Sequence, residues 1–291
     1  MATRRKLTPK FNQPVAKGGI LSPALSQAGW FETQLRKLIY PMMDEAEKEI
    51  KALFASPAAD VLEDGTVVAQ DESFTEKVAR LMKNLTGKYS SLFDIAAPSI
   101  ASEFVQRGDR HAKSTLKGSL SDLSGKISIN HEAMPPALKE TLQASVQQSV
   151  GLIKRVPLDY LGQLQGDVMR AITTGAGLED VQKSLAERKV VMRNWVHNTS
   201  LDQTRKIYNT TTSKRMQAVG LQRFEWVHVG GSVHPREYHK KPVSQGGLNG
   251  GIYSFDDLPI IDEKTGQRGL PGDAINCHCT MRPIVEFNTG D

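Results

Sequence analysis

The cysteines and histidines near the C-terminal end of the chain are the residues best suited to specific chemistry. Cys277 and Cys279 are the only cysteines and are one residue apart, so on an extended segment both side chains project to the same face while His278 points away. A structural zinc ion takes four ligands, preferably thiolates and imidazoles. His239 and His234 lie on the other side of a glycine-rich stretch, and we therefore expect them to complete a zinc site with the two cysteines.

This pattern leaves other interpretations open. Cys-X-Cys is not the usual spacing of a zinc site, and the alternative without a metal is a pair of reduced, half-buried thiols beside surface histidines. A cysteine near a histidine can be a nucleophile with its base, and a metal with an open position can be hydrolytic. The sequence contains no His-Glu-X-X-His motif, nucleophile elbow or phosphate loop, so we expect no enzyme activity and assign no catalytic residue.

Other polar residues of the same region have weaker assignments. Asp273 is a further candidate for a metal ligand. Arg236, Arg268 and Arg282 could bind a phosphate group or a carboxylate of a partner, although an exposed, solvated arginine is the commoner situation.

Composition limits the class of protein. A chain of 291 residues with 39% hydrophobic residues can form one large or two ordinary domains. Its net charge of +5 permits contact with nucleic acid or an acidic partner without requiring it. No apolar run is long enough to cross a bilayer, and residues 1–10 lack the apolar core of a signal peptide, so we expect a cytosolic origin.

A basic segment, residues 1–27, precedes the first helical pattern. It carries no acidic residue, and its prolines and glycines predict a flexible tail without regular structure. A basic arm of this kind can lie on nucleic acid, and a solvated terminus is the alternative. The candidate DNA contacts are its cationic side chains Arg4, Arg5, Lys6, Lys10 and Lys17.

Hydrophobic residues recur at steps of three and four residues through most of the chain, which predicts a mostly helical body. The predicted helices cover residues 30–55, 73–97, 136–155, 158–172, 178–188 and 190–219. The first two are expected to pair antiparallel. Residues 108–133, rich in Gly, Ser, Lys and Asp, predict an extended connection with a short strand at residues 126–129.

Local signals set the expected ends of these helices. Ser73 and Glu76 form a capping box at the start of the second helix, and Pro98 interrupts that helix before the hydrophobic pattern resumes. Pro157 separates the third helix from the fourth, and Gly220 ends the last helix as its C-cap.

After Gly220 the pattern changes to short β-prone runs between glycine-rich loops. The predicted strands lie at residues 224–229, 252–255 and 281–287. The expected fold class is therefore α+β, with a mostly helical N-terminal body and a small, loop-rich α+β C-terminal module. The predicted domains are a basic tail (1–27), a helical domain (28–177) and the C-terminal module (178–291).

The order of motifs between residues 178 and 286 resembles a known family. These motifs are Asp202-Gln203-Thr204-Arg205, Asn209, Gly220, Phe224-Glu225-Trp226, Pro235-Arg236, His239, Gly251, Phe255, Pro259, Pro271-Gly272 and Cys277-His278-Cys279. The succession is similar to the Mu F-like, or head morphogenesis, minor head proteins of tailed bacteriophages. The family usually has Cys-Arg-Cys at the end and an acidic residue shortly after the tryptophan strand, where this chain has His278 and Gly230-Gly231.

The resemblance implies a minor component of the phage virion rather than an enzyme. Such proteins occur in few copies inside the head, near the portal vertex, and are linked to head assembly, DNA packaging and DNA ejection. The implied partners are the portal protein, the major capsid or scaffold protein and double-stranded phage DNA, with no membrane. The alternative function is that of a metal-dependent nuclease, peptidase or transferase that uses His239 and the two cysteines.

Overall fold

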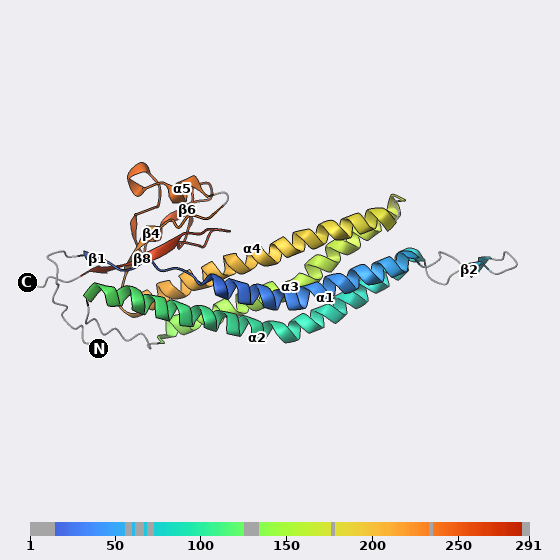
Figure 1. The fold of residues 1–291 in the computed structure, drawn as a ribbon, viewed down its shortest axis with the longest axis horizontal. Coiled ribbons are helices and arrows are strands. Elements are labelled where there is room, and N and C mark those ends of the chain that lie inside the picture. Colours follow the sequence, from blue (N-terminus) through green and yellow to red (C-terminus); the bar gives the residue numbers. More distant parts are fainter. Residues whose placement is uncertain are drawn as a thin grey trace, which may run out of the picture. The chain divides into compact units, whose positions relative to one another are not determined.

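Four long α-helices and a small sheet dominate the part of the chain that the computed structural model describes (Figure 1). This part comprises residues 15–55, 60–61, 67–68, 73–124, 134–175, 178–232 and 235–286. The long helices are α1 (Leu25–Ala55), α2 (Phe74–Ser124), α3 (Pro136–Thr173) and α4 (Leu178–Ala218). The predicted α+β class, with its mostly helical body and small C-terminal sheet, is confirmed. Among the helices described, none is long and apolar enough to span a membrane.

The helices are longer than the hydrophobic pattern predicts, because they continue through prolines that were expected to break them. Pro98 lies within α2 and Pro157 within α3, so the predicted breaks at these residues are wrong. A proline removes one backbone hydrogen bond and crowds the preceding turn. Burial of neighbouring side chains offsets this cost, since Ala97 and Ala101 are fully buried around Pro98, and Leu161 is fully buried one turn after Pro157. α4 is likewise one continuous helix where two were predicted.

Residues 108–124 belong to α2, so the predicted extended connection is wrong over this range. Ala112, Leu116 and Leu120 recur every four residues and are at most 1% exposed. Burial of this stripe outweighs the low helix propensity of the glycine and serine residues between them. The predicted strand at residues 126–129 lies outside the described residues.

The chain forms two compact units whose boundaries differ from the predicted domains. Unit 1 consists of Met1–Gly29, Ser102–Val146 and Asn198–Asp291, and unit 2 consists of Trp30–Ala101 and Gln147–His197. Each long helix therefore contributes residues to both units. The prediction followed a change of local pattern near residue 178, whereas compact units are set by packing between segments that are distant in the sequence.

Within unit 2, α1 and α2 pair antiparallel, as the hydrophobic pattern predicts. Near the middle of the pair, Tyr89 of α2 donates its hydroxyl hydrogen to Glu45 of α1 at 2.6 Å. Near its end, the rings of Phe54 and Phe74 meet edge to face with their centroids 4.9 Å apart. Residue numbers therefore fall along one helix as they rise along the other.

Unit 1 carries a four-stranded antiparallel sheet with the strand order β1-β8-β4-β5. Its strands are β1 (Val15–Lys17), β4 (Arg223–Val227), β5 (Ile252–Ser254) and β8 (Thr280–Glu286). In the central pair, Val227 lies opposite Thr280 and Arg223 lies opposite Ile284. This register decides which residues meet just beyond the end of β4.

Smaller elements surround this sheet or lie apart from it. The loop between β4 and β5 contains α5 (Glu237–Lys240) and the 3₁₀ turn η1 (Val243–Gln245). Strands β6 (Ile260–Asp262) and β7 (Gln267–Arg268) form a separate antiparallel pair, as do β2 (Asp60–Val61) and β3 (Val67–Val68) between α1 and α2.

The N-terminal edge strand comes from the segment predicted to be a flexible tail. β1 pairs with β8, and Leu21 is fully buried, with its backbone N–H donated to the Met281 carbonyl at 3.0 Å. α1 begins at Leu25. The prediction of a tail without regular structure is therefore wrong for residues 15–27, and residues 1–14 lie outside the described residues.

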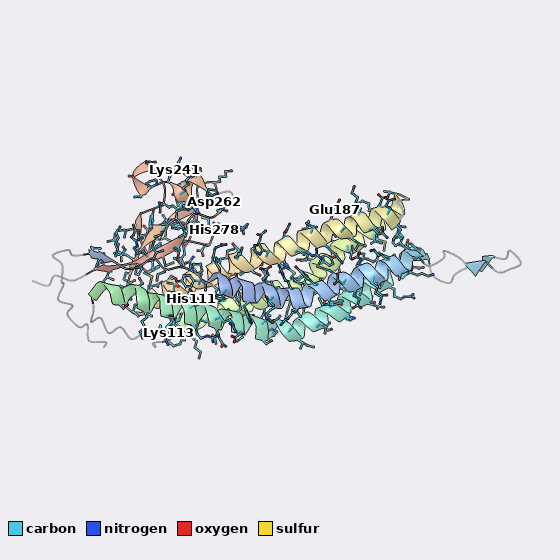
Figure 2. The ribbon with its side chains drawn as sticks, viewed as in Figure 1. His111, Lys113, Glu187, Lys241, Asp262 and His278 are labelled. Carbon is cyan, nitrogen blue, oxygen red and sulfur yellow. The ribbon has the colours of Figure 1, made fainter. Side chains whose placement is uncertain are left out.

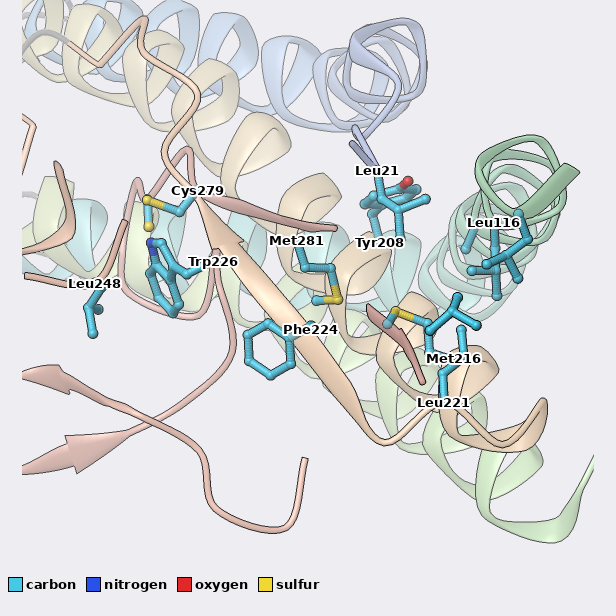
Figure 3. Close-up of a cluster of buried hydrophobic side chains, with 14 of the residues drawn as sticks. Leu21, Leu116, Tyr208, Met216, Leu221, Phe224, Trp226, Leu248, Cys279 and Met281 are labelled. Carbon is cyan, nitrogen blue, oxygen red and sulfur yellow. The ribbon is translucent and has the colours of Figure 1, made fainter. Parts of the chain in front are cut away.

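A single buried cluster joins the sheet to α2 and α4 in unit 1 (Figure 3). The central strands contribute Phe224, Trp226 and Met281, each fully buried, and the helices contribute Leu116, Tyr208 and Met216, at most 1% exposed. Cys277 and Cys279 belong to the same cluster. The candidate ligands are therefore fixed by the packing of the core rather than carried on a free loop.

Candidate metal centre

Three of the predicted ligands meet in one buried group. His239 lies on α5, and Cys277 and Cys279 lie on the extended segment that leads into β8. Their exposed fractions are 2%, 4% and 3%. The Nδ1 atom of His239 lies 3.4 Å from Sγ of Cys277 and 4.0 Å from Sγ of Cys279, and the three ligand atoms all lie within 4.8 Å of one another. Both sulfur atoms thus face one imidazole, as the Cys-X-Cys spacing predicts.

The orientation of the His239 ring is fixed from its far side. Its Nε2 atom lies 2.7 Å from the carbonyl oxygen of Ile261 in β6. A carbonyl only accepts hydrogen bonds, so Nε2 carries a hydrogen and Nδ1 faces the sulfurs. Metal-binding histidines commonly donate their second ring N–H to a backbone carbonyl or carboxylate in this way. The arrangement therefore suits metal ligation through Nδ1.

The electrostatics of the group favour a thiolate at Cys277 and keep hydrogens on His239 and Cys279. A hydrogen bond from Cys279, aided by one from His239, lowers the pKa of the Cys277 thiol to about 4, although burial opposes this. Burial also opposes a charge on His239, but its hydrogen bonds to Cys277 and Ile261 outweigh burial and raise its pKa. The pKa of Cys279 is raised, because it shares its hydrogen with Cys277 and is buried. Binding of a metal ion by all three side chains would therefore displace hydrogens from His239 and Cys279.

Two buried polar side chains support the Cys-X-Cys segment. Asn209 of α4 is fully buried and donates from Nδ2 to the Cys279 carbonyl at 3.3 Å. Trp226 lies beside Cys279 in the same core (Figure 3), and its indole ring carries one Nε1–H donor. This Nε1–H is buried and has no partner meeting hydrogen-bond geometry in the part of the chain that the structure describes. A thiolate at Cys279 would accept that hydrogen, because thiolates in metal sites accept hydrogen bonds from surrounding donors.

Neither His278 nor Asp273, which both lie among the described residues, belongs to this group. His234 lies outside the described residues. The Nδ1 atom of His278, which is labelled in Figure 2, lies 3.3 Å from the carbonyl oxygen of Gly230. Asp273 accepts the backbone N–H of Leu270 at 2.7 Å, which shows that its carboxylate is engaged in a local turn.

The candidate phosphate-binding arginines have partners within the protein. Arg236 donates to the carbonyl oxygen of Ile275 at 3.0 Å, Arg268 pairs with Asp257 at 2.5 Å, and Arg282 pairs with Glu225 at 3.2 Å. Of the residues predicted to contact DNA, only Lys17 is among those that the structure describes. Lys17 lies in β1 and pairs with Glu225 at 2.9 Å, whereas Arg4, Arg5, Lys6 and Lys10 lie outside the described residues.

One histidine beside this group is missing from the sequence-based prediction of the site. His228 directly follows β4, and its Nδ1 atom lies 3.6 Å from Sγ of Cys279. The register of the sheet explains this contact, because Val227 lies opposite Thr280 and the next residues on each strand are His228 and Cys279. His228 lies within the strand predicted at residues 224–229, but the hydrophobic pattern does not encode the strand register that brings it beside Cys279.

Comparison with known protein families supports the family resemblance that the motifs of this region predict. The model of the family described as "Phage Mu protein F like protein" matches residues 162–282. This range contains β4, the first three residues of β8, His228, His239 and both cysteines. The resemblance predicted from the motifs is therefore confirmed over residues 162–282.

A match over the length of the chain is more distant. A curated protein of Haemophilus influenzae, described as uncharacterized, is 22% identical over 260 residues. The match covers 89% of this chain and 53% of the relative, so the chain spans about half the length of the curated relative that it matches. No solved structure matches the chain.

Proposed function

We propose that this protein is a minor head protein of a tailed phage, located in the virion near the portal vertex. The observation that carries the proposal is the match of residues 162–282 to the Mu F-like family. In this proposal the protein binds the portal protein and the major capsid or scaffold protein. It acts there in head assembly, DNA packaging or DNA ejection.

The proposed role of the metal centre is structural. His239, Cys277 and Cys279 would hold a zinc ion, which joins the short helix α5 to the segment that leads into β8. The segment between these elements is rich in glycine, and its strands β5, β6 and β7 are only two or three residues long, so a metal ion would help it to keep its shape. A structural metal contributes its binding free energy directly to folding.

Contact with phage DNA is proposed for the basic residues at the N-terminus. Arg4, Arg5, Lys6 and Lys10 precede the first strand by a few residues. They provide positive charge without a neighbouring carboxylate in the sequence. Lys17 is a weaker candidate than these four, because its ammonium group already pairs with Glu225.

The alternative function, that of a metal-dependent nuclease, peptidase or transferase, would need a different metal coordination at the same site. A catalytic zinc ion keeps one coordination position open for water or substrate, whereas a structural one is closed by four protein ligands. The number of protein ligands therefore separates the two functions.

Quantitative mass spectrometry of purified phage particles tests the proposed role. Particles should be induced from a strain that carries the gene, and the protein should be counted against the portal subunit. We expect the protein in DNA-filled heads at no more than a single copy per portal subunit, and we expect a deletion strain to yield defective particles. Absence from both mature heads and head precursors would overturn the proposal.

A further inference from the structure

The metal centre has one ligand fewer than a closed tetrahedral site, and the structure offers a fourth. The three atoms that all lie within 4.8 Å of one another belong to His239, Cys277 and Cys279. Immediately beside this group lies His228, which is half-buried and has its Nδ1 atom 3.6 Å from Sγ of Cys279. Its position follows from the pairing of β4 with β8 and not from a mobile loop.

The interatomic distances agree with those between ligands of one zinc ion. Zinc binds sulfur at about 2.3 Å and imidazole nitrogen at about 2.0–2.1 Å, so sulfur and nitrogen ligands at a tetrahedral angle are about 3.6 Å apart. The distances from His239 to the two sulfurs are 3.4 and 4.0 Å, and that from His228 to Cys279 is 3.6 Å. All three therefore lie within a few tenths of an ångström of the expected value.

Hydrogen bonds fix the backbone at His228 and at the end of β4, as the position of a metal ligand requires. Its N–H is donated to Oδ1 of Asn249 at 3.0 Å, and the Gly250 N–H is donated to the Trp226 carbonyl at 2.8 Å. The glycine-rich loop thus fixes the end of β4. His228 is not one of the three residues whose ligand atoms all lie within 4.8 Å of one another, so a tetrahedral arrangement requires its side chain to move toward them.

We infer that His228 is the fourth ligand of the metal centre, which closes it as a site of two histidines and two cysteines. This inference rests on the proposed zinc centre but not on the proposed place in the phage head. It replaces His234 of the sequence-based prediction. A closed site leaves no position for a hydrolytic water, so it also argues against the metal-dependent enzyme.

Cobalt substitution of the purified full-length protein tests the inference. Co²⁺ bound by two thiolates and two imidazoles gives strong visible absorption, and displacement by Zn²⁺ then measures affinity. We expect His228→Ala to reduce this absorption and to weaken zinc binding by more than the roughly 10–100-fold that loss of an outer contact costs. The matched controls are His278→Ala and His234→Ala, which should bind both metals as the wild-type protein does.

A second variant covers the case in which His228→Ala does not fold. His228→Cys keeps a ligand at the position, and we expect it to increase the thiolate-to-cobalt charge-transfer absorption, which a merely structural role would not do. The inference fails if His228→Ala keeps the wild-type spectrum and affinity, and also if His234→Ala is the variant that loses them. If the wild-type protein binds neither Co²⁺ nor Zn²⁺, the proposed metal centre itself fails, while the count of the protein in virions still decides its role in the head.

Discussion

His239 and Ile261 form a hydrogen bond of 2.7 Å between Nε2 and the backbone carbonyl oxygen. This contact links α5 to β6 and turns Nδ1 of the ring toward the two cysteines. The hairpin of β6 and β7, which carries no candidate metal ligand of its own, thereby orients the candidate ligand His239. Burial opposes a charge on this histidine, which is 2% exposed, but its hydrogen bond with Cys277, together with this contact to Ile261, raises its pKa.

We expect His239→Ala to destabilise the protein by about 3 kcal/mol or more in the presence of zinc. The change removes a metal ligand and the bond to Ile261, and loss of a structural metal is loss of folding free energy. Thermal unfolding with and without a chelator measures the effect, and the chelator should destabilise the wild-type protein but hardly affect the variant. His197→Ala is the control, because its side chain is 56% exposed. A variant that melts like the wild type but loses an enzymatic activity would refute the structural role.

We expect Leu21→Ala to cost about 2–5 kcal/mol of unfolding free energy, the usual range for a fully buried leucine. Leu21 is fully buried between β8 and the helices of unit 1, whereas the adjacent Ile20 is 47% exposed. Ile20→Ala is therefore the matched control, with an expected cost below about 1 kcal/mol. Denaturant titration of both variants measures the difference. Equal costs would show that the N-terminal segment is not part of the folded sheet.

We expect Asp109→Ala to destabilise unit 1 by roughly 3 kcal/mol, because it removes the carboxylate partner of a buried arginine. Two nitrogens of Arg215 donate to the two Asp109 oxygens at 2.7 Å, and the Arg215 side chain is only 6% exposed. Asp94→Ala, on the same helix, breaks an exposed pair with Lys154 and should cost less than about 1 kcal/mol. Chemical denaturation compares the two. A cost for Asp109→Ala no larger than that of the control would mean that the pair adds nothing to stability.

The pair of Asp167 and Arg188 should make stability depend on acid pH. A hydrogen bond from Arg188, with a further one from Ser184, lowers the pKa of Asp167 below its usual 3.8. A lowered pKa in the folded state stabilises the protein above the unfolded-state value, and this stabilisation is lost as the pH falls through the folded-state value. We therefore expect Asp167→Asn to cost about 1–2 kcal/mol at neutral pH and progressively less below about pH 4.

Asp159→Asn is the control for this pH dependence. Asp159 lies on the same helix and pairs with Arg155, but the two side chains are 52% and 76% exposed. The control should change stability by less than about 0.5 kcal/mol at every pH. Unfolding curves at several pH values test both variants, and a cost for Asp167→Asn that stays constant from neutral to acid pH would contradict the assignment.

Deletion of residues 1–14 should weaken DNA binding without lowering the melting temperature. The deletion removes Arg4, Arg5, Lys6 and Lys10 but leaves β1 intact. Each phosphate contact contributes about −0.9 to the slope of log K against log salt concentration, so the slope should flatten. Binding to double-stranded DNA at several salt concentrations measures it. An unchanged slope would exclude the arm as a DNA contact, and a lower melting temperature would show that it also stabilises the fold.

The sequence by itself determined the features that depend on neighbouring residues. The predicted capping box forms, since the Ser73 N–H is donated to Glu76 at 2.7 Å and the Glu76 N–H to Ser73 Oγ at 3.3 Å. Gly220 ends α4 with a φ of 86°, a conformation that glycine adopts without strain. The Cys-X-Cys spacing likewise predicts that both sulfurs face one side. In each case the geometry is set within a few residues of chain.

Only the tertiary structure decided the features that depend on distant residues. Whether Pro98 and Pro157 break their helices is settled by burial on either side, and β1 forms because β8 provides an edge at the other end of the chain. The place of His228 beside Cys279 depends on the register of β4 against β8. A shift of one residue would turn that side chain to the other face, and only the packing of the whole core selects among such registers.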